Sequence, residues 1–284
     1  MKLIKLIGLQ KFEVVEKYLV FIEKIILSCL ALIQNNIIYN FMRKEFPRQT
    51  GQFKIKPKRK TAQWKDFEVA RLQISMDNEK QTGEKLKNAV DWCCSGRFVR
   101  VVAIVSDTLN WFNLSVKHNL NKADALKLAL HEGDLWLEKN SFIRDYNIEI
   151  KRWDEWMLHP KYNSRLSVIR KLFLTNEDFK NNLNEVSKRI MESKLLDLTT
   201  YSDSHLKRFR EMSKEYILCE LSVFSIMFNE EEAIEIYPGS WLKNIFEILS
   251  TYSSEYSFLQ CFNNKPYLQI EFERNKSFEA HRLK

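Results

Sequence analysis

The chain has 284 residues, of which 45% are hydrophobic and 13% aromatic, enough to bury one substantial core. With only 6 Gly and 5 Pro, a largely disordered or turn-rich chain is excluded, and long helices with a few short strands are favoured. A formal charge of +8 favours a polyanionic partner without choosing among RNA, DNA and anionic lipid. The five cysteines show neither metal-ligand nor CxxC spacing, so we expect no metal site and a reduced, cytoplasmic location.

Residues 1–46 are predicted to form an N-terminal helical extension. Within it, residues 25–42 carry no formal charge and approach the length of a membrane span. Gln34, Asn35 and Asn36 interrupt that run, so one or two amphipathic helices are expected rather than stable membrane insertion.

Residues 47–63 are predicted to be a basic linker that acts as a solvated tether. Basic side chains cluster there around Pro57, namely Lys54, Lys56, Lys58, Arg59 and Lys60. Such a run usually only keeps a segment in solvent, but it can also serve as an arm that binds phosphate groups.

Residues 64–284 are predicted to form one α/β domain. Strands are expected at residues 69–76 and 98–106, with a helix at 79–94 between them, and the second strand is a continuous apolar run typical of burial on both faces. This βαβ pattern predicts a Rossmann-like, mostly parallel sheet flanked by helices. Further helices are expected at 122–146, 162–194 (one or two), 204–228 and 241–252, and further strands at 148–153, 232–237 and 266–273.

Polar clusters follow three of these strands, at residues 75–78, 106–108 and 237–240. In a parallel α/β sheet, reactive side chains collect outside the carboxyl ends of the strands. The first cluster places Ser75 before a helix, where backbone amides can stabilise a developing negative charge. Ordinary helix caps and a turn would explain all three clusters equally well, so the residues alone leave both interpretations open.

A fourth feature lies in the predicted helix 204–228. Tyr216 and Glu220 are four residues apart and therefore share one helix face, next to the apolar Leu221 and Phe224. A carboxylate on a partly apolar face needs a partner, and a bound ammonium group would serve. The alternative is a surface glutamate beside a core tyrosine.

Taken in order, these segments resemble the tRNA-dependent cyclodipeptide synthases over roughly residues 68–275. The resemblance is carried by RLQISMDNEKQTGEKLKNAVDW, RFVRVVAIVSDTLNWFNL, EYILCELSVF and EIYPGS. It implies a Rossmann-like domain similar to the catalytic domain of the class I tyrosyl- and tryptophanyl-tRNA synthetases. It also implies aminoacyl-tRNAs as partners, with no role for DNA. The oligomeric state stays open, with a monomer favoured.

The resemblance implies that Ser75 is the nucleophile that receives the first aminoacyl group, with Asn78 as its polar support. Tyr216 and Glu220 would hold the α-amine, and Tyr237 would align the ester and move protons. An aminoacyl-tRNA is an activated ester, so this exchange needs no ATP, metal or other cofactor. A second aminoacyl-tRNA would then give a dipeptidyl-enzyme that cyclises and releases a cyclic dipeptide.

The sequence departs from the family pattern in two places, the helix 122–146 and the position two residues before Ser75. The helix 122–146 is not dominated by basic residues, so tRNA contact is predicted at the cluster 54–60 and at Lys207, Arg208, Arg210 and Lys214. Two residues before Ser75, where the family usually has a glycine, this chain has Gln73.

Strand side chains alternate, so Gln73 should share a face with Ser75, and Glu235 should share one with Tyr237. Both are predicted to line the pocket for a polar or cationic first aminoacyl group. The alternative places Glu235 in solvent.

Two other functions are compatible with a Rossmann-like domain of this kind. An ATP-dependent synthetase is disfavoured because the chain lacks HIGH-type and KMSKS-type motifs. A non-catalytic module that binds RNA or a partner on the same scaffold remains the alternative, because a fold does not guarantee a function.

Overall fold

The computed structural model describes residues 53–59, 67–194, 202–239, 242–263 and 265–274. All of them belong to a unit that spans Gln49–Lys284, and the predicted N-terminal extension lies outside the described residues. Among the helices of the described ranges, none combines the length and the hydropathy needed to cross a membrane.

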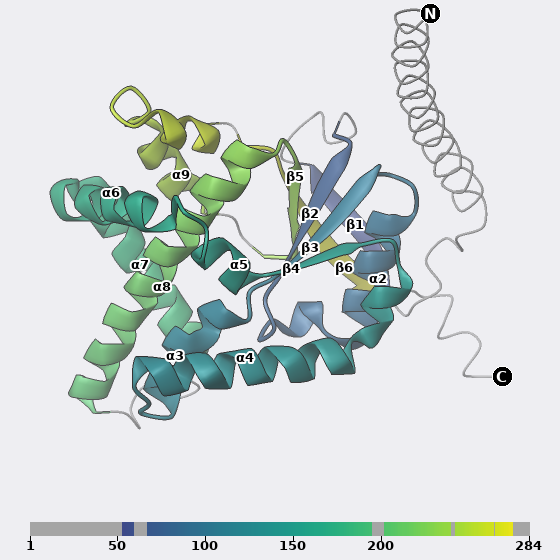
Figure 1. Ribbon diagram of the computed structural model, residues 1–284, viewed down its shortest axis with the longest axis horizontal. Coiled ribbons are helices and arrows are strands. Elements are labelled where there is room, and N and C mark those ends of the chain that lie inside the picture. The colour runs from purple at the N-terminus through teal and green to yellow at the C-terminus, as the bar shows by residue number, and fades with distance from the viewer. Residues whose placement is uncertain (1–52, 60–66, 195–201, 240–241, 264, 275–284) are drawn as a thin grey trace, which may run out of the picture. The chain divides into compact units, whose positions relative to one another are not determined.

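In the described ranges, six strands form one sheet in the order β1-β6-β5-β2-β3-β4 (Figure 1). Strands β5, β2, β3 and β4 are mutually parallel, and β6 is parallel to β5, while β1 pairs antiparallel with β6 at the edge. This confirms the predicted Rossmann-like, mostly parallel α/β fold. The strands are β1 (Phe53–Arg59), β2 (Val69–Ile74), β3 (Arg100–Val105), β4 (Glu149–Arg152), β5 (Ile234–Tyr237) and β6 (Tyr267–Arg274).

The predicted basic tether at residues 47–63 is wrong in its described part. Phe53–Arg59 forms β1, and the side chains alternate as a strand requires, with Ile55 buried and Lys54 and Lys56 exposed. The Lys56 Nζ lies 3.1 Å from an Oε of Glu273 on β6. Charged lysines on an edge strand also discourage pairing with another chain, so the basic residues suit this position.

Helices lie on both faces of the sheet. Figure 1 shows α6, α7, α8 and α9 together on one side, with α2 on the other. The predicted segment 162–194 is two helices, and the predicted helix 122–146 ends at Lys139, where a 3-10 turn follows. The helices are α2 (Gly83–Cys94), α3 (Trp111–Lys117), α4 (Lys122–Lys139), α5 (Trp153–Met157), α6 (Tyr162–Thr175), α7 (Glu177–Lys194), α8 (Asp203–Glu230) and α9 (Lys243–Ser250).

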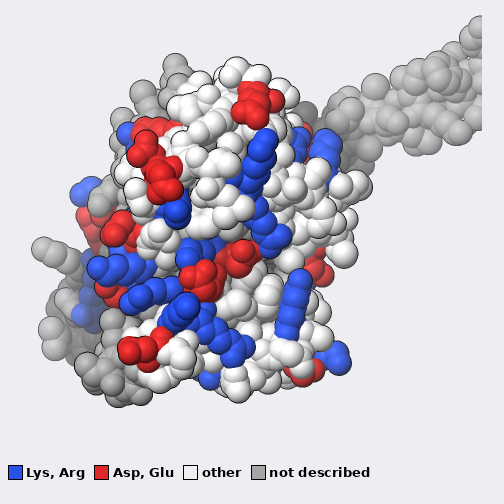
Figure 2. All heavy atoms as spheres, turned by 90° about the vertical axis from the view of Figure 1, so that its left-hand side faces the viewer, with Lys and Arg blue, Asp and Glu red and all other residues white. Residues whose placement is uncertain are grey.

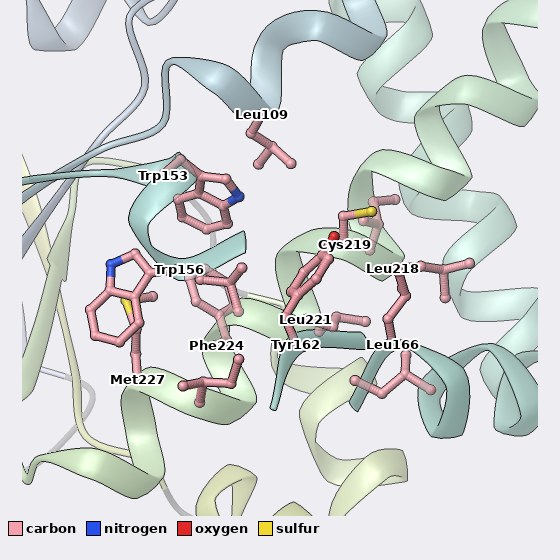
Figure 3. Packing of buried hydrophobic residues seen from close by; sticks show 14 of the residues in the cluster. Leu109, Trp153, Trp156, Tyr162, Leu166, Leu218, Cys219, Leu221, Phe224 and Met227 are labelled. Atoms are coloured by element: carbon pink, nitrogen blue, oxygen red, sulfur yellow. The ribbon is translucent and has the colours of Figure 1, made fainter. Parts of the chain in front are cut away.

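The alternation of side chains along β2 gives the two faces of the sheet different contents. Ala70, Leu72 and Ile74 point to one face and pack with apolar residues of α2. The opposite face is covered by α8, whose Phe224 makes an edge-to-face contact with Trp153 at a ring distance of 6.0 Å. Figure 3 shows Trp153, Tyr162 and residues of α8 packed together there. This packing holds α8 against that face of the sheet.

Gly133 marks a close approach of α4 to the sheet. A Cβ there would lie 2.7 Å from an Nη of Arg152 and 2.8 Å from the Cβ of Asp107. Asp107 is buried and accepts hydrogen bonds from the backbone of Thr108 at 2.7 Å and of Trp153 at 3.3 Å, so it cannot move freely. Its capping contact with Thr108 matches the simpler interpretation of the cluster 106–108.

We expect Gly133→Ala to lower the free energy of unfolding by about 1–3 kcal/mol, because the added methyl group overpacks this contact. In a helix without this contact, replacing glycine with alanine would raise the stability by about 1 kcal/mol. The sign of the change in the free energy of unfolding therefore distinguishes overpacking from helix propensity. Urea unfolding of the wild type and the variant measures it. An equal or higher stability of the variant would show that the contact relaxes without cost.

Candidate active site

A cavity of about 790 Å³ opens beyond the carboxyl ends of β2, β3 and β5. The predicted catalytic residues Ser75, Tyr216, Glu220 and Tyr237 all line it, although they come from two strand ends and one helix. Asn78 lines it as well. The structure therefore brings together side chains that are far apart in the chain. Asn78 and Tyr237, which are 159 residues apart, are joined by a hydrogen bond.

The turn after β2 holds Ser75 rigidly. The backbone N–H of Asn78 donates to the carbonyl oxygen of Ser75 at 3.1 Å. The buried side chain of Gln81 accepts from the backbone N–H of Ser75 at 2.9 Å and donates to the carbonyl oxygen of Gln73. The backbone amides of Ser75 and Asn78 are thus already satisfied, and neither is free to stabilise an oxyanion.

Asn78 has two roles at this turn. Its Oδ1 accepts from the backbone N–H of Lys80 at 3.0 Å, which is an ordinary N-cap contact. Its Nδ2 donates to the hydroxyl oxygen of Tyr237 at 3.3 Å, which links the turn after β2 to the end of β5. The capping interpretation is therefore correct but incomplete.

Helix α8 presents Tyr216, Glu220 and Phe224 to the cavity, at the four-residue spacing that keeps them on one face. Burial raises the pKa of Glu220 to about 8. The pKa of Tyr216 is raised well above its usual value by burial and then by the nearby charge of Glu220. No cationic side chain in the described ranges pairs with Glu220. The site thus contains a desolvated carboxyl group that a bound cation would complete.

Tyr237 ends β5 and turns its ring towards Gly239. A Cβ at Gly239 would overlap the Tyr237 ring, so this position favours glycine. The hydroxyl of Tyr267 donates to the carbonyl oxygen of Gly239 and fixes the turn. Burial raises the pKa of Tyr237, although the hydrogen bond from Asn78 opposes this. The phenol is therefore neutral at physiological pH and can both donate and accept a hydrogen bond.

Gln73 lines the cavity as predicted, but Glu235 does not. Glu235 is fully buried, and its Oε1 lies 2.8 Å from the Nε of Arg71 and 3.7 Å from the Nζ of Lys265, in ion pairs. The prediction that Glu235 lines the pocket is wrong, because these neighbours already compensate its charge inside the protein, and the alternative that it faces solvent is wrong too. The prediction that it shares a face with Tyr237 fits the strand alternation.

Several polar residues of the cavity wall were missed by the sequence analysis. Their amide and basic side chains come from the N-cap and first turn of α3 and from α7 and α9, and no motif marks them in the sequence. They are Asn110, Asn113, Asn182, Arg189, Lys243 and Asn244. Ser106, from the cluster after β3, lines the cavity too.

Among the described residues, no histidine lies in the cavity to activate the hydroxyl of Ser75, as a histidine does in serine hydrolases. None of the histidines in the described ranges lines the cavity, and the hydroxyl of Ser75 makes no hydrogen bond to another described residue. A serine–histidine hydrolase needs a histidine within hydrogen-bond reach of the serine. The geometry therefore suits a substrate that is already activated.

The predicted tRNA contacts are spread over two regions. Lys54 and Lys56 are exposed on β1. Lys58 and Arg59 also lie on β1, but their side chains, like the whole of Lys60, lie outside the described part of the structure. Figure 2 shows another face of the molecule, the left-hand side of Figure 1, where α6, α7 and α8 lie. On that face, basic and acidic side chains are mixed and do not form one basic patch.

The second region is the first half of α8. Lys207 and Arg210 are exposed there. Arg208 donates to the Oδ1 of Asn119 at 2.5 Å and to carbonyl oxygens between α3 and α4, so it also holds that connection in place. Lys214 pairs with Glu211 at 2.6 Å. Of these four residues, Lys207 and Arg210 are therefore the better placed for phosphate groups.

Comparison with known proteins gives matches by structure alone. No family model matches the sequence, and no curated protein matches it either. A CDPS from Fluoribacter dumoffii has a TM-score of 0.67 at 19% identity, covering 78% of this chain and 100% of its own. A cyclodipeptide synthase from Candidatus Glomeribacter gigasporarum, bound to Phe-tRNAPhe, has a TM-score of 0.54 at 19% identity, covering 73% and 88%.

A Mycobacterium tuberculosis protein, whose structure relates cyclodipeptide synthetases to type I tRNA synthetases, has a TM-score of 0.54 at 13% identity, covering 82% of this chain and 98% of its own. These matches extend over nearly the whole length of each solved chain. The protein thus has the fold of the cyclodipeptide synthases, as the sequence resemblance predicted.

Proposed function

We propose that this protein is a tRNA-dependent cyclodipeptide synthase, which joins the amino acids of two aminoacyl-tRNAs through an aminoacyl group on Ser75. The observation that carries the proposal is the single cavity lined by Ser75, Tyr216, Glu220 and Tyr237. A serine, two phenols and an unpaired carboxyl group are the groups needed to accept an acyl group, hold an amine and move a proton.

In the first half-reaction, the Oγ of Ser75 attacks the ester carbonyl carbon of the first aminoacyl-tRNA. The bond between that carbon and the ribose oxygen breaks, the serine proton is passed to the ribose oxygen, and the tRNA leaves. Tyr237 can relay this proton because its neutral hydroxyl both donates and accepts. No histidine is required, because the ester is already activated and positioning supplies most of the rate.

In the second half-reaction, the α-amine of the aminoacyl-enzyme attacks the ester of the second aminoacyl-tRNA. A peptide bond forms, the second tRNA leaves, and the new terminal amine attacks the Ser75 ester. The serine hydroxyl is restored and a cyclic dipeptide is released. Each attacking amine must lose a proton. Because burial raises the pKa of Glu220 to about 8, this group holds its own proton in the empty site at neutral pH, and it can accept one from an amine after it has ionised.

The size of the cavity agrees with this sequence of steps. Its volume of about 790 Å³ lies in the usual range of small-molecule sites, about 300–1,000 Å³, and leaves room for a dipeptidyl group. We place the reaction in the cytoplasm, where aminoacyl-tRNAs are made. The tRNA body would then contact the exposed basic residues of β1 and α8 through its phosphates.

Production of cyclic dipeptides in a bacterial host tests the proposal. We expect cells that express the full chain to release cyclic dipeptides that mass spectrometry detects and that are absent with an empty vector. The purified protein should form the same products from two aminoacyl-tRNAs without ATP. If the protein binds tRNA but forms no product under either condition, the non-catalytic binding module is the correct alternative.

A further inference from the structure

The wall of the cavity next to Ser75 is formed by the side chain of Gln73. This residue is 6% exposed, and its Nε2 donates to an Oε of Glu235 at 2.6 Å. Glu235 itself has no exposed surface. The contact between them is short and buried, and it decides which end of the amide faces the cavity.

The carboxylate of Glu235 is locked by its neighbours. Arg71, which stands beside it on β2, has its Nε 2.8 Å from the Oε1 of Glu235. Arg71 also donates to the carbonyl oxygens of Met227 at 2.6 Å and Glu231 at 2.8 Å, where the end of α8 favours a positive charge. Lys265 donates to the carbonyl oxygen of Ala233 at 3.0 Å and completes the cluster.

A carboxylate that is paired with cations can only accept hydrogen bonds. Gln73 must therefore turn its NH₂ group towards Glu235, and its carbonyl oxygen in the opposite direction. That oxygen has no hydrogen-bond donor among the described residues, and it is not enclosed by protein. It is an acceptor that faces the cavity.

The position of this acceptor relates it to the substrate side chain. Gln73 lies on β2 and Ser75 directly follows this strand, two residues further on, which corresponds to about 7 Å of extended chain. Both residues line the cavity. The α-amine would be held by Tyr216 and Glu220 on α8, and the reacting carbonyl carbon would lie at Ser75. The part of the first aminoacyl group left to meet Gln73 is its side chain.

We infer that Glu235 is a positioning residue that fixes the amide of Gln73, and that the site thereby selects a first aminoacyl group whose neutral side chain donates a hydrogen bond. Hydroxyl, carboxamide and ring N–H groups belong to this class. Cationic side chains are disfavoured, because Arg71 and Lys265 already exceed the single charge of Glu235. This inference rests on the proposed function and specifies its substrate.

Competition between aminoacyl-tRNAs of matched shape tests the inference. Tyrosyl-tRNA competes with phenylalanyl-tRNA, and threonyl-tRNA with valyl-tRNA, and the two aminoacyl groups transferred to Ser75 in one vessel are quantified by mass spectrometry. We expect the wild type to prefer the donor member of a pair by on the order of 10- to 100-fold, since an unmet buried acceptor is costly. Such a ratio does not depend on the amount of folded protein.

Two variants test whether the side-chain amide of Gln73 causes this preference. Gln73→Met keeps the size and the ion pairs of Glu235, and should bring the ratio close to one. Glu235→Gln lets the Gln73 amide face either way, and should also lower the ratio. Glu149→Gln makes the same chemical change at an exposed carboxylate on β4, paired with Arg100 at 3.0 Å, and should leave the ratio as it is.

The outcomes separate this inference from the proposed function. If aminoacyl groups reach Ser75 but the wild type prefers the apolar members, or Gln73→Met leaves the ratio unchanged, the inference is wrong and the proposed function stands. If no aminoacyl-tRNA transfers its group, both fail together. Should Glu235→Gln not fold, Gln73→Met decides alone, because it leaves the ion pairs intact.

Discussion

Replacing Ser75 with alanine is expected to abolish the aminoacyl-enzyme and to lower the rate of cyclic dipeptide formation by at least about 1,000-fold, as loss of a covalent nucleophile does in other enzymes. The reason is specific to this cavity: no histidine of the described ranges lines it, so no other group is placed to act as an acyl carrier with a base. Incubation with a radiolabelled aminoacyl-tRNA, followed by acid precipitation, measures the covalent label.

The matched control is Ser106→Ala, since Ser106 contributes a hydroxyl to the same cavity from the end of β3. We expect this variant to keep the label, and peptide mapping of the wild type should place the label on Ser75. Both variants should have the circular dichroism spectrum of the wild type, because neither hydroxyl is buried in a hydrogen-bonded core position. Labelling of Ser75→Ala at wild-type levels would disprove the covalent step.

The sequence predicted the centre of the sheet better than its edge. Strand β3 is a nearly unbroken apolar run, and burial on both faces makes such a strand conspicuous. In β2, the apolar Ala70, Leu72 and Ile74 alternate with Arg71 and Gln73, which is also typical of a strand. Strand β1 was missed because its exposed Lys54 and Lys56 and its proline are typical of a tether, while Ile55 is the one buried residue among the β1 side chains that the structure describes. Its partner, β6, lies at the other end of the domain, and a contact so distant in sequence leaves no local pattern.

In the site, too, residues that follow a local pattern were predicted, and contacts between distant segments were not. Ser75 follows β2 and Tyr237 ends β5, while Tyr216 and Glu220 share a helix face. Sheet topology and helix periodicity therefore bring them together. The register of Glu235 was predicted, but its environment was not. Arg71 stands directly beside it across two parallel strands, and this pairing depends on a strand order that the sequence does not specify.

Glu220→Gln is expected to have the second large effect, on activity and on the pH dependence of stability. Glutamine keeps the shape but removes the charge and the proton acceptor, so the rate of cyclic dipeptide formation should fall by about 100- to 1,000-fold. Burial raises the pKa of Glu220 from 4.5 to about 8, so the folded protein holds this proton more tightly than the unfolded chain. The wild type should therefore lose stability progressively as the pH rises from about 4.5 to 8, and Glu220→Gln should not show this part of the loss.

Urea unfolding at pH 5 and at pH 8.5 measures this difference, and it requires no substrate. Glu215→Gln is the control on the same helix, because its carboxylate is partly exposed and pairs with Arg170 at 2.6 Å. That control should follow the pH dependence of the wild type. If wild type, Glu220→Gln and Glu215→Gln all lose stability equally between the two pH values, the carboxyl group in the cavity is not desolvated, and a bound ammonium would gain little from it. If only Glu220→Gln resists the rise in pH, the free site holds a neutral acid, and binding of an ammonium group must be coupled to release of its proton.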